Sequence, residues 1–345
     1  MNFAEGSLTL ALVGDVYVNR PDPASSFTPT LAHLRAADIL FGNCEMPISE
    51  AGEPWPGKPL GKNLYKMPPE SIAAFTAAGF HVMSVASNHS IDFGRAALLR
   101  TLELLDGAGI LRCGAGTTLD EAHRPALVTK NGLSVAFLAY CSLYMPGWEA
   151  APDRSGIATV HVETAYKPHP RIHEVPGSPA ITLNFPDAVD RDRVVADIRA
   201  ARTRADLVVV SWHWGVSEGY RLLVPYQLEL GHAALDAGAD LLIGHHPHML
   251  QGVEIYNGKP LFYSLGNFAF DLKSRLFRPE TVIVRCRITN KRIDRVSVLP
   301  CMIDEHSVPQ PVSATADSQV TRFLAESSAE FGTRFQPDGD ELVIT

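Results

Sequence analysis

The sequence predicts an α/β fold of packed sheets and helices, and three observations support this fold class. Strand and helix patterns alternate between residues 8 and 244, which is typical of a layered α/β protein. After residue 248 the rhythm changes to consecutive strand patterns, such as TVIVRCRIT and DRVSVLP. The 345 residues are 46% hydrophobic and 20% charged, a balance that favours a globular chain and excludes disorder for most of it.

The first elements of this pattern lie before residue 110. An apolar run at 8–14 ends at Gly14-Asp15 and predicts the first core strand. Residues 69–78 begin with proline in the first turn and predict a helix. Residues 94–109 carry leucines at helical spacing and end in glycine, which predicts a second helix. The other elements predicted here are a short helix at 29–36 and strands at 37–43 and 81–87.

The later part of the chain repeats the alternation before it changes. The predicted elements are strands at 133–141, 206–213 and 240–244 and helices at 188–202 and 226–238. Asn257-Gly258 between apolar runs predicts a hairpin. Residues 144–186, rich in Pro, Gly and His, are interpreted as a long insertion over the active face. We therefore expect one domain over residues 1–304 and a polar surface extension over 305–345.

Charge and cysteine usage exclude several classes of protein. Lys plus Arg total 30 against 38 Asp plus Glu, and the net charge of −8 gives no general attraction to nucleic acid or anionic lipid. No apolar run is long enough for membrane insertion, and residues 1–20 lack the pattern of a signal peptide. The five cysteines are widely spaced without a C-x-x-C motif, so we expect reduced core residues in a cytoplasmic protein.

Side chains able to bind a metal or move a proton follow the strands predicted in the α/β region. They are Asp15, Glu45, Asn88, His89, His213, His245, His246 and His248. Taken singly, each is typical of a turn, a helix cap or a satisfied polar residue. If the strands are parallel, their carboxyl ends meet at one edge of the sheet, where open α/β folds bind ligands. Together these carboxylates, the amide and the imidazoles form a mixed oxygen and nitrogen set suited to divalent cations.

Several motifs that keep their order along the chain resemble one family. They are GD (14–15), GNCE (42–45), SNHSIDFG (87–94), HWG (213–215), GHHPHMLQGVE (244–254) and FYSLGNFAFD (262–271). They look like the CapA-type branch of the calcineurin-like metallophosphoesterase superfamily, which includes proteins of poly-γ-glutamate synthesis. GHHPH followed by SLGNF is the most specific of these signals. The resemblance implies a four-layer α/β/β/α sandwich with a two-metal site at the strand ends.

The resemblance also implies roles for individual residues. The implied metal ligands are Asp15 for the first metal, Glu45 as the bridging carboxylate, Asn88, His213 and His246 for the second metal, and His248 returning to the first. His89 would be the acid/base residue, with Asp92 to orient it. Tyr17 stands where the family usually has a histidine, and the bridging carboxylate is Glu instead of Asp. Because these departures remove a nitrogen ligand, we expect one or two divalent ions per chain from among Ca²⁺, Mn²⁺, Mg²⁺ and Zn²⁺.

More than one function fits such a site. With two metals, phosphoester hydrolysis is the superfamily default. Alternatively, His89 with Asp92 and His248 or His246 with Asp15 could act as acid/base pairs on opposite faces of a peptide Cα, as in the soluble lasso-peptide epimerase type. The sequence narrowly favours this peptide epimerase over a phosphoester hydrolase or a poly-γ-glutamate biosynthesis enzyme. A non-catalytic, metal-stabilised peptide-binding module is a further alternative, and no oligomeric state is indicated.

The expected substrate is a peptide or a poly-γ-glutamyl chain. The residues expected to bind it are Tyr17, Tyr144, Trp148, Trp214, Glu218 and His245, with Met145, Trp212 and Tyr220 nearby in an aromatic groove. The competing explanation is that aromatics beside strands pack in the core. GVSEG at 215–219 matches a serine nucleophile elbow, but Pro225 follows Ser217 before any clear helix, which disfavours a serine hydrolase.

Overall fold

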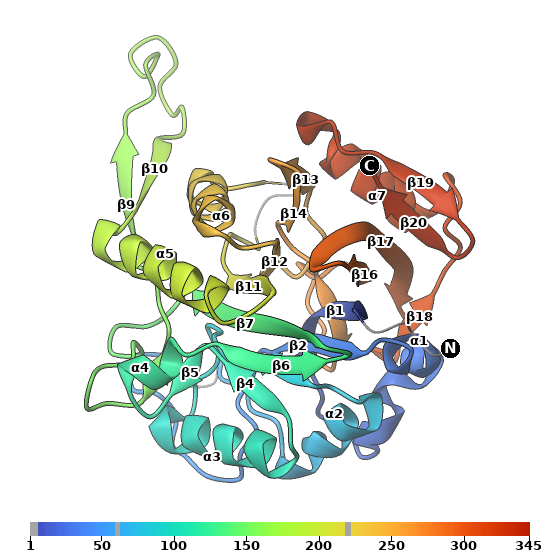
Figure 1. Cartoon of the computed structure of the whole chain (residues 1–345). Helices are drawn as coiled ribbons and strands as arrows, with labels where there is room; N and C mark the ends of the chain where they lie inside the picture. The colour runs from blue at the N-terminus through green and yellow to red at the C-terminus, as the bar shows by residue number, and fades with distance from the viewer. Residues whose placement is uncertain (1–5, 59–62, 218–221) are drawn as a thin grey trace.

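Two β-sheets pack face to face with helices on their outer sides, as the computed structural model shows for residues 6–58, 63–217 and 222–345 (Figure 1). The helices outside the first sheet include α2 (Ile72–Ala78) and α3 (Gly94–Gly107), and those outside the second are α5 (Ala188–Arg202) and α6 (Pro225–Ala237). This arrangement is the predicted α/β/β/α sandwich, and the fold class is confirmed.

The first sheet combines a parallel half with an antiparallel half. Its strand order is β19 (Phe335–Asp338), β20 (Glu341–Ile344), β17 (Arg292–Ile303), β16 (Glu280–Thr289), β1 (Ser7–Tyr17), β2 (Ile39–Cys44), β3 (Val82–Ser84) and β4 (Leu111–Cys113). Strands β1 to β4 are parallel, and β15 (Asn267–Phe270) also pairs parallel with β1. The remaining pairs, including that of β18 (Pro309–Pro311) with β17, are antiparallel.

The second sheet is mostly parallel. Its order is β13 (Val253–Tyr256), β14 (Lys259–Phe262), β12 (Leu241–His245), β11 (Leu207–His213), β7 (Leu133–Cys141) and β6 (Ala126–Lys130). Strands β7, β11, β12 and β14 are parallel, and β13–β14 is the hairpin predicted at Asn257-Gly258. The smaller elements are α1 (Leu31–Arg35), α4 (Leu119–Ala122), α7 (Gln319–Ser327), the 3-10 turns Pro23–Thr30, Pro69–Ser71 and Ala329–Phe331, and the pairs β5 (Ala115–Gly116) with β8 (Gly156–Ile157) and β9 (Val162–Lys167) with β10 (Ile181–Pro186).

Strand β7 shows why a central strand of the second sheet appears in the sequence as a continuous apolar run. Val135 and Phe137 face the first sheet, where Phe137 stacks on Phe41 of β2 with ring centroids 5.3 Å apart. Ala136 and Leu138 face the opposite way, into the core beneath α5 and α6. Because both faces of such a strand are buried, alternation between polar and apolar residues disappears.

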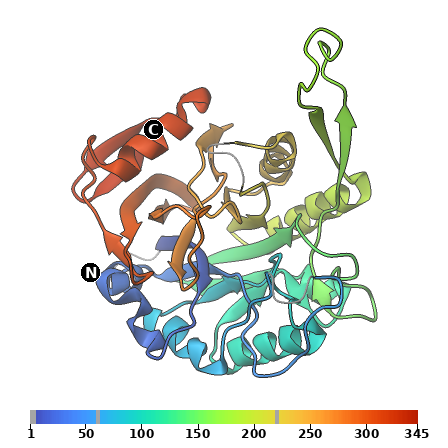
Figure 2. The same cartoon turned by 180° about the vertical axis from the view of Figure 1, so that it is seen from behind.

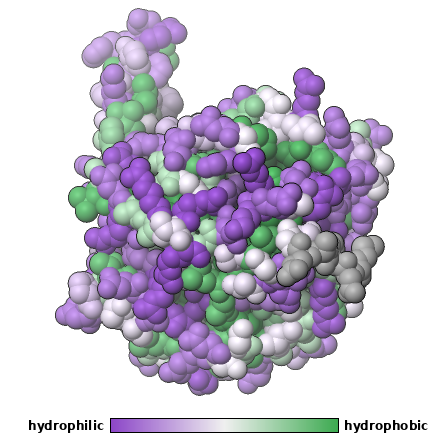
Figure 3. Space-filling view, in the orientation of Figure 1, coloured by the Kyte–Doolittle hydropathy of each residue, from purple (hydrophilic) through white to green (hydrophobic). Residues whose placement is uncertain are grey.

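Residues 144–186 only partly follow the expectation of an insertion over the active face. Residues 144–160 stay against the body of the protein, and Trp148 is buried there. The β9–β10 hairpin instead stands away from the body, which both views show (Figures 1 and 2). Apolar side chains of the hairpin remain exposed, including Phe185 at 51%, and they appear green in the space-filling view (Figure 3). This hairpin therefore does not cover the strand ends.

Residues 305–345 are more integrated than a surface extension. Strand β20 pairs with β17 and lengthens the first sheet, with Val343 opposite Ser297. Helix α7 buries Val320 and Leu324. The high polarity of this segment hides these contacts, because only one face of each element is apolar. Among the described helices, none combines the length and apolar character needed to cross a bilayer.

Candidate metal centre

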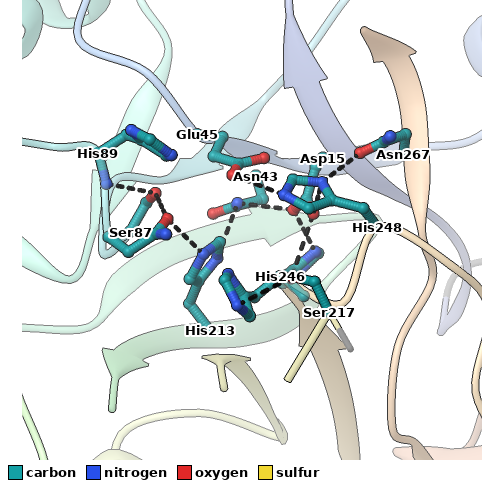
Figure 4. A network of polar contacts seen from close by, with 12 residues as sticks. Asp15, Asn43, Glu45, Ser87, His89, His213, Ser217, His246, His248 and Asn267 are labelled. Carbon is teal, nitrogen blue, oxygen red and sulfur yellow. Dashed lines mark hydrogen bonds and ion pairs between the residues drawn. The ribbon is translucent and has the colours of Figure 1, made fainter. Parts of the chain in front are cut away.

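The carboxyl ends of strands from both sheets meet at one site. Asp15 lies in β1, Glu45 directly follows β2, and the loop after β3 carries His89. From the second sheet, His213 ends β11 and the turn after β12 carries His246 and His248 (Figure 4). The strands that carry these residues are parallel within their sheets, so their carboxyl ends lie together, and segments as much as 231 residues apart in sequence come into contact here.

Asp15, Glu45 and His248 form the tightest cluster of metal-ligating atoms in the described part of the chain. One ligand atom from each lies within 4.8 Å of the others, and all three residues are buried. Nε2 of His248 is 3.6 Å from Oε1 of Glu45, and Nδ1 of His248 is 4.0 Å from Oδ2 of Asp15. These separations are too long for hydrogen bonds, so the three side chains face one common point without bonding to one another.

A cation fits this point, because buried polar atoms around it have no hydrogen-bond partner among the described residues. They include both carboxylate oxygens of Glu45 and Nδ1 of His246. An unpaired buried polar group costs about 1–3 kcal/mol, and a charged one costs more. Oxygen and imidazole nitrogen are also the donors that divalent metals take in proteins. The chemistry of the donor set therefore suits a divalent ion.

The other predicted ligands lie beside this cluster and are connected to it. His213 Nε2 is 3.0 Å from Oδ1 of Asn88, and His213 Nδ1 is 3.4 Å from Nδ2 of Asn43. Asn43 Nδ2 donates to Oδ1 of Asp15 at 2.8 Å, while the backbone N–H of His246 donates to Oδ2 at 3.2 Å. The imidazoles of His213 and His246 lie edge to face, with centroids 5.1 Å apart. The structure thus brings the predicted ligands together.

Burial and neighbouring charges shift the pKa values of these groups. Burial alone would raise the pKa of Asp15, but contact with His245 and the nearby His213 and His248 lower it well below the usual carboxyl value. Burial and the charges of Asp15 and Asp92 raise the pKa of Glu45. Burial also lowers the pKa of His213 and His248, and with His248 nearby it lowers the pKa of His246 to about 3. Neutral imidazoles are the form that binds metals.

His89 and Asp92 form a second buried unit at the rim of the site. Nδ1 of His89 lies 2.6 Å from Oδ2 of Asp92, and the backbone N–H of Tyr65 donates to the same oxygen at 2.9 Å. The Lys58 ammonium is ion-paired with the other oxygen, Oδ1. An ionised carboxylate only accepts, so Nδ1 of His89 carries the proton and Nε2 is the nitrogen left to react. Burial lowers the pKa of His89, although Asp92 opposes this.

A pocket of about 320 Å³ reaches His89 of this unit and His248 of the candidate metal cluster. Its polar lining consists mainly of Asn88, His89, Ser217, His246 and His248. Its apolar lining includes Tyr65, Phe270, Leu272, Leu276 and Phe277. The Phe277 ring packs 4.3 Å from the imidazole of His248, measured between centroids. The pocket therefore combines polar side chains with apolar ones.

A sequence profile described as "Bacterial capsule synthesis protein PGA_cap" matches residues 9–272, which include Asp15, Glu45 and His248 of the candidate metal cluster. The chain belongs to this PGA_cap family. Capsule biosynthesis protein CapA of Bacillus anthracis is 28% identical over 98% of this chain and 77% of its own length. A probable polyglutamine synthesis accessory protein of Mycobacterium tuberculosis is 30% identical over 89% of this chain and 77% of its own length. PGA biosynthesis protein CapA of Bacillus subtilis is 28% identical over 92% of this chain and 77% of its own length.

Several residues that we expected to bind substrate occupy other places in this PGA_cap protein. Trp148 and Trp214 are completely buried in the two hydrophobic cores and offer no surface to a ligand. Trp214 donates from Nε1 to the backbone oxygen of Tyr263 at 2.9 Å. These two expectations need correction, because the sequence pattern places an aromatic beside a strand end but does not say which way it faces.

The remaining expected substrate residues are divided between core and rim. Tyr17 is 5% exposed and packs on Phe270 with centroids 5.5 Å apart. His245 is buried, with Nδ1 3.2 Å from Oδ1 of Asp15, so it lies against a member of the candidate metal cluster and not in the pocket wall. Tyr144 is half-buried, and burial raises its pKa to about 12. Glu218 and Tyr220 lie outside the described residues.

Ser217 does not occupy a nucleophile elbow. Strand β11 ends at His213 and α6 begins at Pro225, so Ser217 is not on a tight strand-to-helix turn. Its hydroxyl lies 3.3 Å from Nε2 of His246. This placement agrees with the sequence pattern, which disfavours a serine hydrolase.

Some site residues in this PGA_cap protein escaped sequence reasoning. Asn43 and Asn267 lie inside the motifs GNCE and SLGNF, and the one signal that marks them is an asparagine at the end of a strand. Asn267 Oδ1 lies 2.8 Å from Nδ1 of His248. Lys58 and Tyr65 belong to an irregular segment after β2, where no periodicity marks them.

Proposed function

We propose that this protein is a metal-dependent enzyme of poly-γ-glutamate synthesis that acts on a γ-glutamyl chain. The observation that carries the proposal is that His89, which is paired with the buried Asp92, lines the same pocket as His248. His248 in turn lies beside Asp15 and Glu45 in the candidate metal cluster. Membership of the PGA_cap family and the names of its relatives support the substrate class.

The residues that would hold metal are the ones gathered at the strand ends. Asp15, Glu45 and His248 would hold one ion, and Asn88, His213 and His246 offer ligands for a second. When bound there, a divalent ion supplies Lewis-acid polarisation of a substrate oxygen. Carboxylate and amide oxygens suit Mg²⁺, Ca²⁺ and Mn²⁺, while the imidazoles also admit Zn²⁺.

His89 would move the proton. Asp92 holds Nδ1, so the ring presents Nε2 to the pocket, and the lowered pKa of His89 keeps the ring neutral near pH 7. A neutral imidazole can take a proton from a nucleophile and return it to a leaving amine when an amide bond is cleaved or transferred. The apolar wall around Phe277 would contact the methylene groups of a glutamyl unit.

The test uses purified protein loaded separately with Mn²⁺, Mg²⁺ or Zn²⁺ and given poly-γ-glutamate of defined length. New amino termini and the size of the polymer would be measured. We expect His89→Gln to lower the rate by about 10²–10⁴-fold while metal content is unchanged. His123→Gln is the matched control, because His123 bonds Asp197 at 2.7 Å and its side chain is as exposed as that of His89, at 9%.

Two outcomes would contradict the proposal. One is turnover of a simple phosphodiester but not of the polymer, which would favour the phosphoester hydrolase. The other is polymer binding without any change in its bonds by the wild type, which would favour the non-catalytic binding module.

A Cα-epimerase is the second candidate, because His89 and His248 both line the pocket and could serve as two acid/base groups. Neither the family description nor the names of the relatives given above mention epimerisation, so this candidate depends on the two imidazoles alone. Incubation of a peptide substrate in deuterium oxide would test it. Deuterium incorporated at Cα with no bond cleaved would favour it, and an unlabelled peptide would reject it.

A further inference from the structure

We propose that Lys58 is a positioning residue for His89 and acts on it through Asp92. The inference rests on the proposed function, in which His89 transfers protons. Lys58 itself does not line the pocket, so the proposal gives it no contact with substrate.

The ammonium group of Lys58 contacts three oxygen acceptors. It is ion-paired with Oδ1 of Asp92 and donates to the backbone oxygens of Asn88 at 2.9 Å and Asn63 at 3.3 Å. Its side chain is only 12% exposed. An ammonium has three N–H donors, and these three acceptors use all of them. These contacts therefore fix the Lys58 ammonium in one position.

Asp92 transmits this position to His89. Its two oxygens are divided, with Lys58 on Oδ1, and His89 Nδ1 and the Tyr65 N–H on Oδ2. Asp92 is completely buried, so its charge needs a nearby cation. Without Lys58, Oδ1 would lack its donor and the carboxylate could turn to capture the His89 N–H with either oxygen. The imidazole would then lose its single orientation.

Trp148 forms the platform beneath Lys58. The ammonium sits 5.0 Å from the centroid of the buried Trp148 ring, within the range of a cation–π contact. Trp55 meets Trp148 edge to face at 6.0 Å, and the Arg95 guanidinium lies 5.6 Å over Trp55. Arg95 also donates to the backbone oxygen of Ser155 at 2.9 Å. Trp148, expected from the sequence to touch substrate, thus supports the residue that fixes Asp92.

The competing explanation is that Lys58 only stabilises the fold. Lys66 provides a matched control for it, because its ammonium lies 4.6 Å over the Phe93 ring and bonds the backbone oxygens of Glu50 and Ala51. Lys66 therefore makes the same kinds of contact, but among the described residues its ammonium forms no ion pair with a buried carboxylate that holds a histidine. The useful variants are Lys58→Met, Lys58→Arg and Lys66→Met.

The first measurement needs no substrate. Nitrogen-15 NMR of the histidine rings in the metal-free full chain reports which nitrogen carries the proton, and His89→Gln assigns the His89 signals. We expect wild type, Lys58→Arg and Lys66→Met to share one Nδ1–H signal for His89. Lys58→Met should broaden or shift that signal, because the ring samples both tautomers. An unchanged His89 signal in folded Lys58→Met would overturn the proposal.

The second measurement determines kcat and KM separately with poly-γ-glutamate as substrate. Misplacement of His89 should lower kcat by about 10–100-fold in Lys58→Met with little change in KM, and Lys58→Arg should restore most of the loss. Equal losses in Lys58→Met and Lys66→Met would indicate a structural role only and would reject the proposal. If the wild type shows no turnover at all, the proposed function fails, while the NMR result still decides the role of Lys58.

Discussion

Nδ1 of His248 donates to Oδ1 of Asn267 at 2.8 Å, and this bond turns Nε2 of the same imidazole toward Glu45. Asn267 begins β15, which pairs parallel with β1 so that Asn267 lies opposite Asp15. Strand β1 carries the proposed ligand Asp15 and also positions Asn267. Asn267 is the hydrogen-bond partner of His248, another proposed ligand. A hydrogen bond to the distant nitrogen of a metal-binding histidine fixes its tautomer and its orientation.

Replacing Asn267 should therefore weaken metal binding without removing a ligand. We expect Asn267→Ala to lower the affinity for Mn²⁺ by about 10–100-fold, measured by isothermal titration calorimetry. Asn184→Ala is the control, because Asn184 bonds only Thr164 in the β9–β10 hairpin among the contacts described. Equal affinities in wild type and Asn267→Ala would show that the bond does not orient His248.

Metal should stabilise the protein through Glu45. A divalent ion at 100 times its Kd adds about 2.7 kcal/mol to the free energy of unfolding. In Glu45→Gln most of the resulting rise in Tm should be lost. The metal-free variant should be at least as stable as wild type, because burial and Asp15 raise the pKa of Glu45 and make its ionised form unfavourable. Scanning fluorimetry with and without EDTA measures both effects, and Glu50→Gln, at an exposed pair with Arg100, is the control.

The ionised Glu121 carboxylate should stabilise the folded protein at neutral pH, and this stabilisation should be lost in acid. Burial alone would raise the pKa of Glu121, but hydrogen bonds from Thr117 and Arg112 lower it from 4.5 to about 2. A depressed folded-state pKa stabilises the protein above pH 4.5, and that contribution is lost as the pH falls toward 2. Glu121→Gln should therefore unfold about 1–2 kcal/mol more easily than wild type at pH 7 but no more easily near pH 2. Urea unfolding across this range is the measurement, and a difference independent of pH would contradict the assignment.

Gly244 should tolerate no side chain. A Cβ there would lie 2.0 Å from the backbone oxygen of Tyr263, directly before His245. We expect Gly244→Ala to lower the free energy of unfolding by about 1–3 kcal/mol and to weaken metal binding, because β12 must shift. Gly107→Ala in α3, where a Cβ meets nothing within 4 Å, should instead be neutral or stabilising by up to about 1 kcal/mol. Urea unfolding of both variants tests the contrast.

Ser217 should not act as a nucleophile. We expect Ser217→Ala to keep its turnover of poly-γ-glutamate within about threefold of wild type, because its hydroxyl contacts only the His246 ring among the interactions described. A loss of turnover in Ser217→Ala as large as that in His89→Gln would instead favour the serine hydrolase interpretation.

Much of the architecture follows from local pattern. Strand β7 and helix α5 have the predicted bounds, 133–141 and 188–202, because the first is a long apolar run and the second is a long segment with buried residues at helical spacing. The strand predicted at 81–87 is shorter, at Val82–Ser84. Its apolar run continues into a loop, where the Ser90 hydroxyl accepts from the backbone N–H of Ser87 at 2.9 Å and holds the turn that presents His89. Apolar runs alone do not distinguish a strand from a buried loop.

Side-chain direction was harder to predict. Trp148 and Trp214 carry no mark in the sequence that separates a core ring from a groove ring, and only their packing partners do so. Residues 305–345 look polar overall, yet β20 and α7 join the first sheet through their narrow apolar faces. Burial depends on which distant surface an element meets.

The sequence by itself determined the layered α/β class and the residue types at the strand ends, because strand and helix periods and the order of metal-ligating side chains are local properties. Only the tertiary structure decided that Lys58 meets Asp92 across 34 residues and that Asn267 supports His248. Those contacts depend on how two sheets and an irregular segment pack together, and no local period encodes the distance between remote parts of a chain.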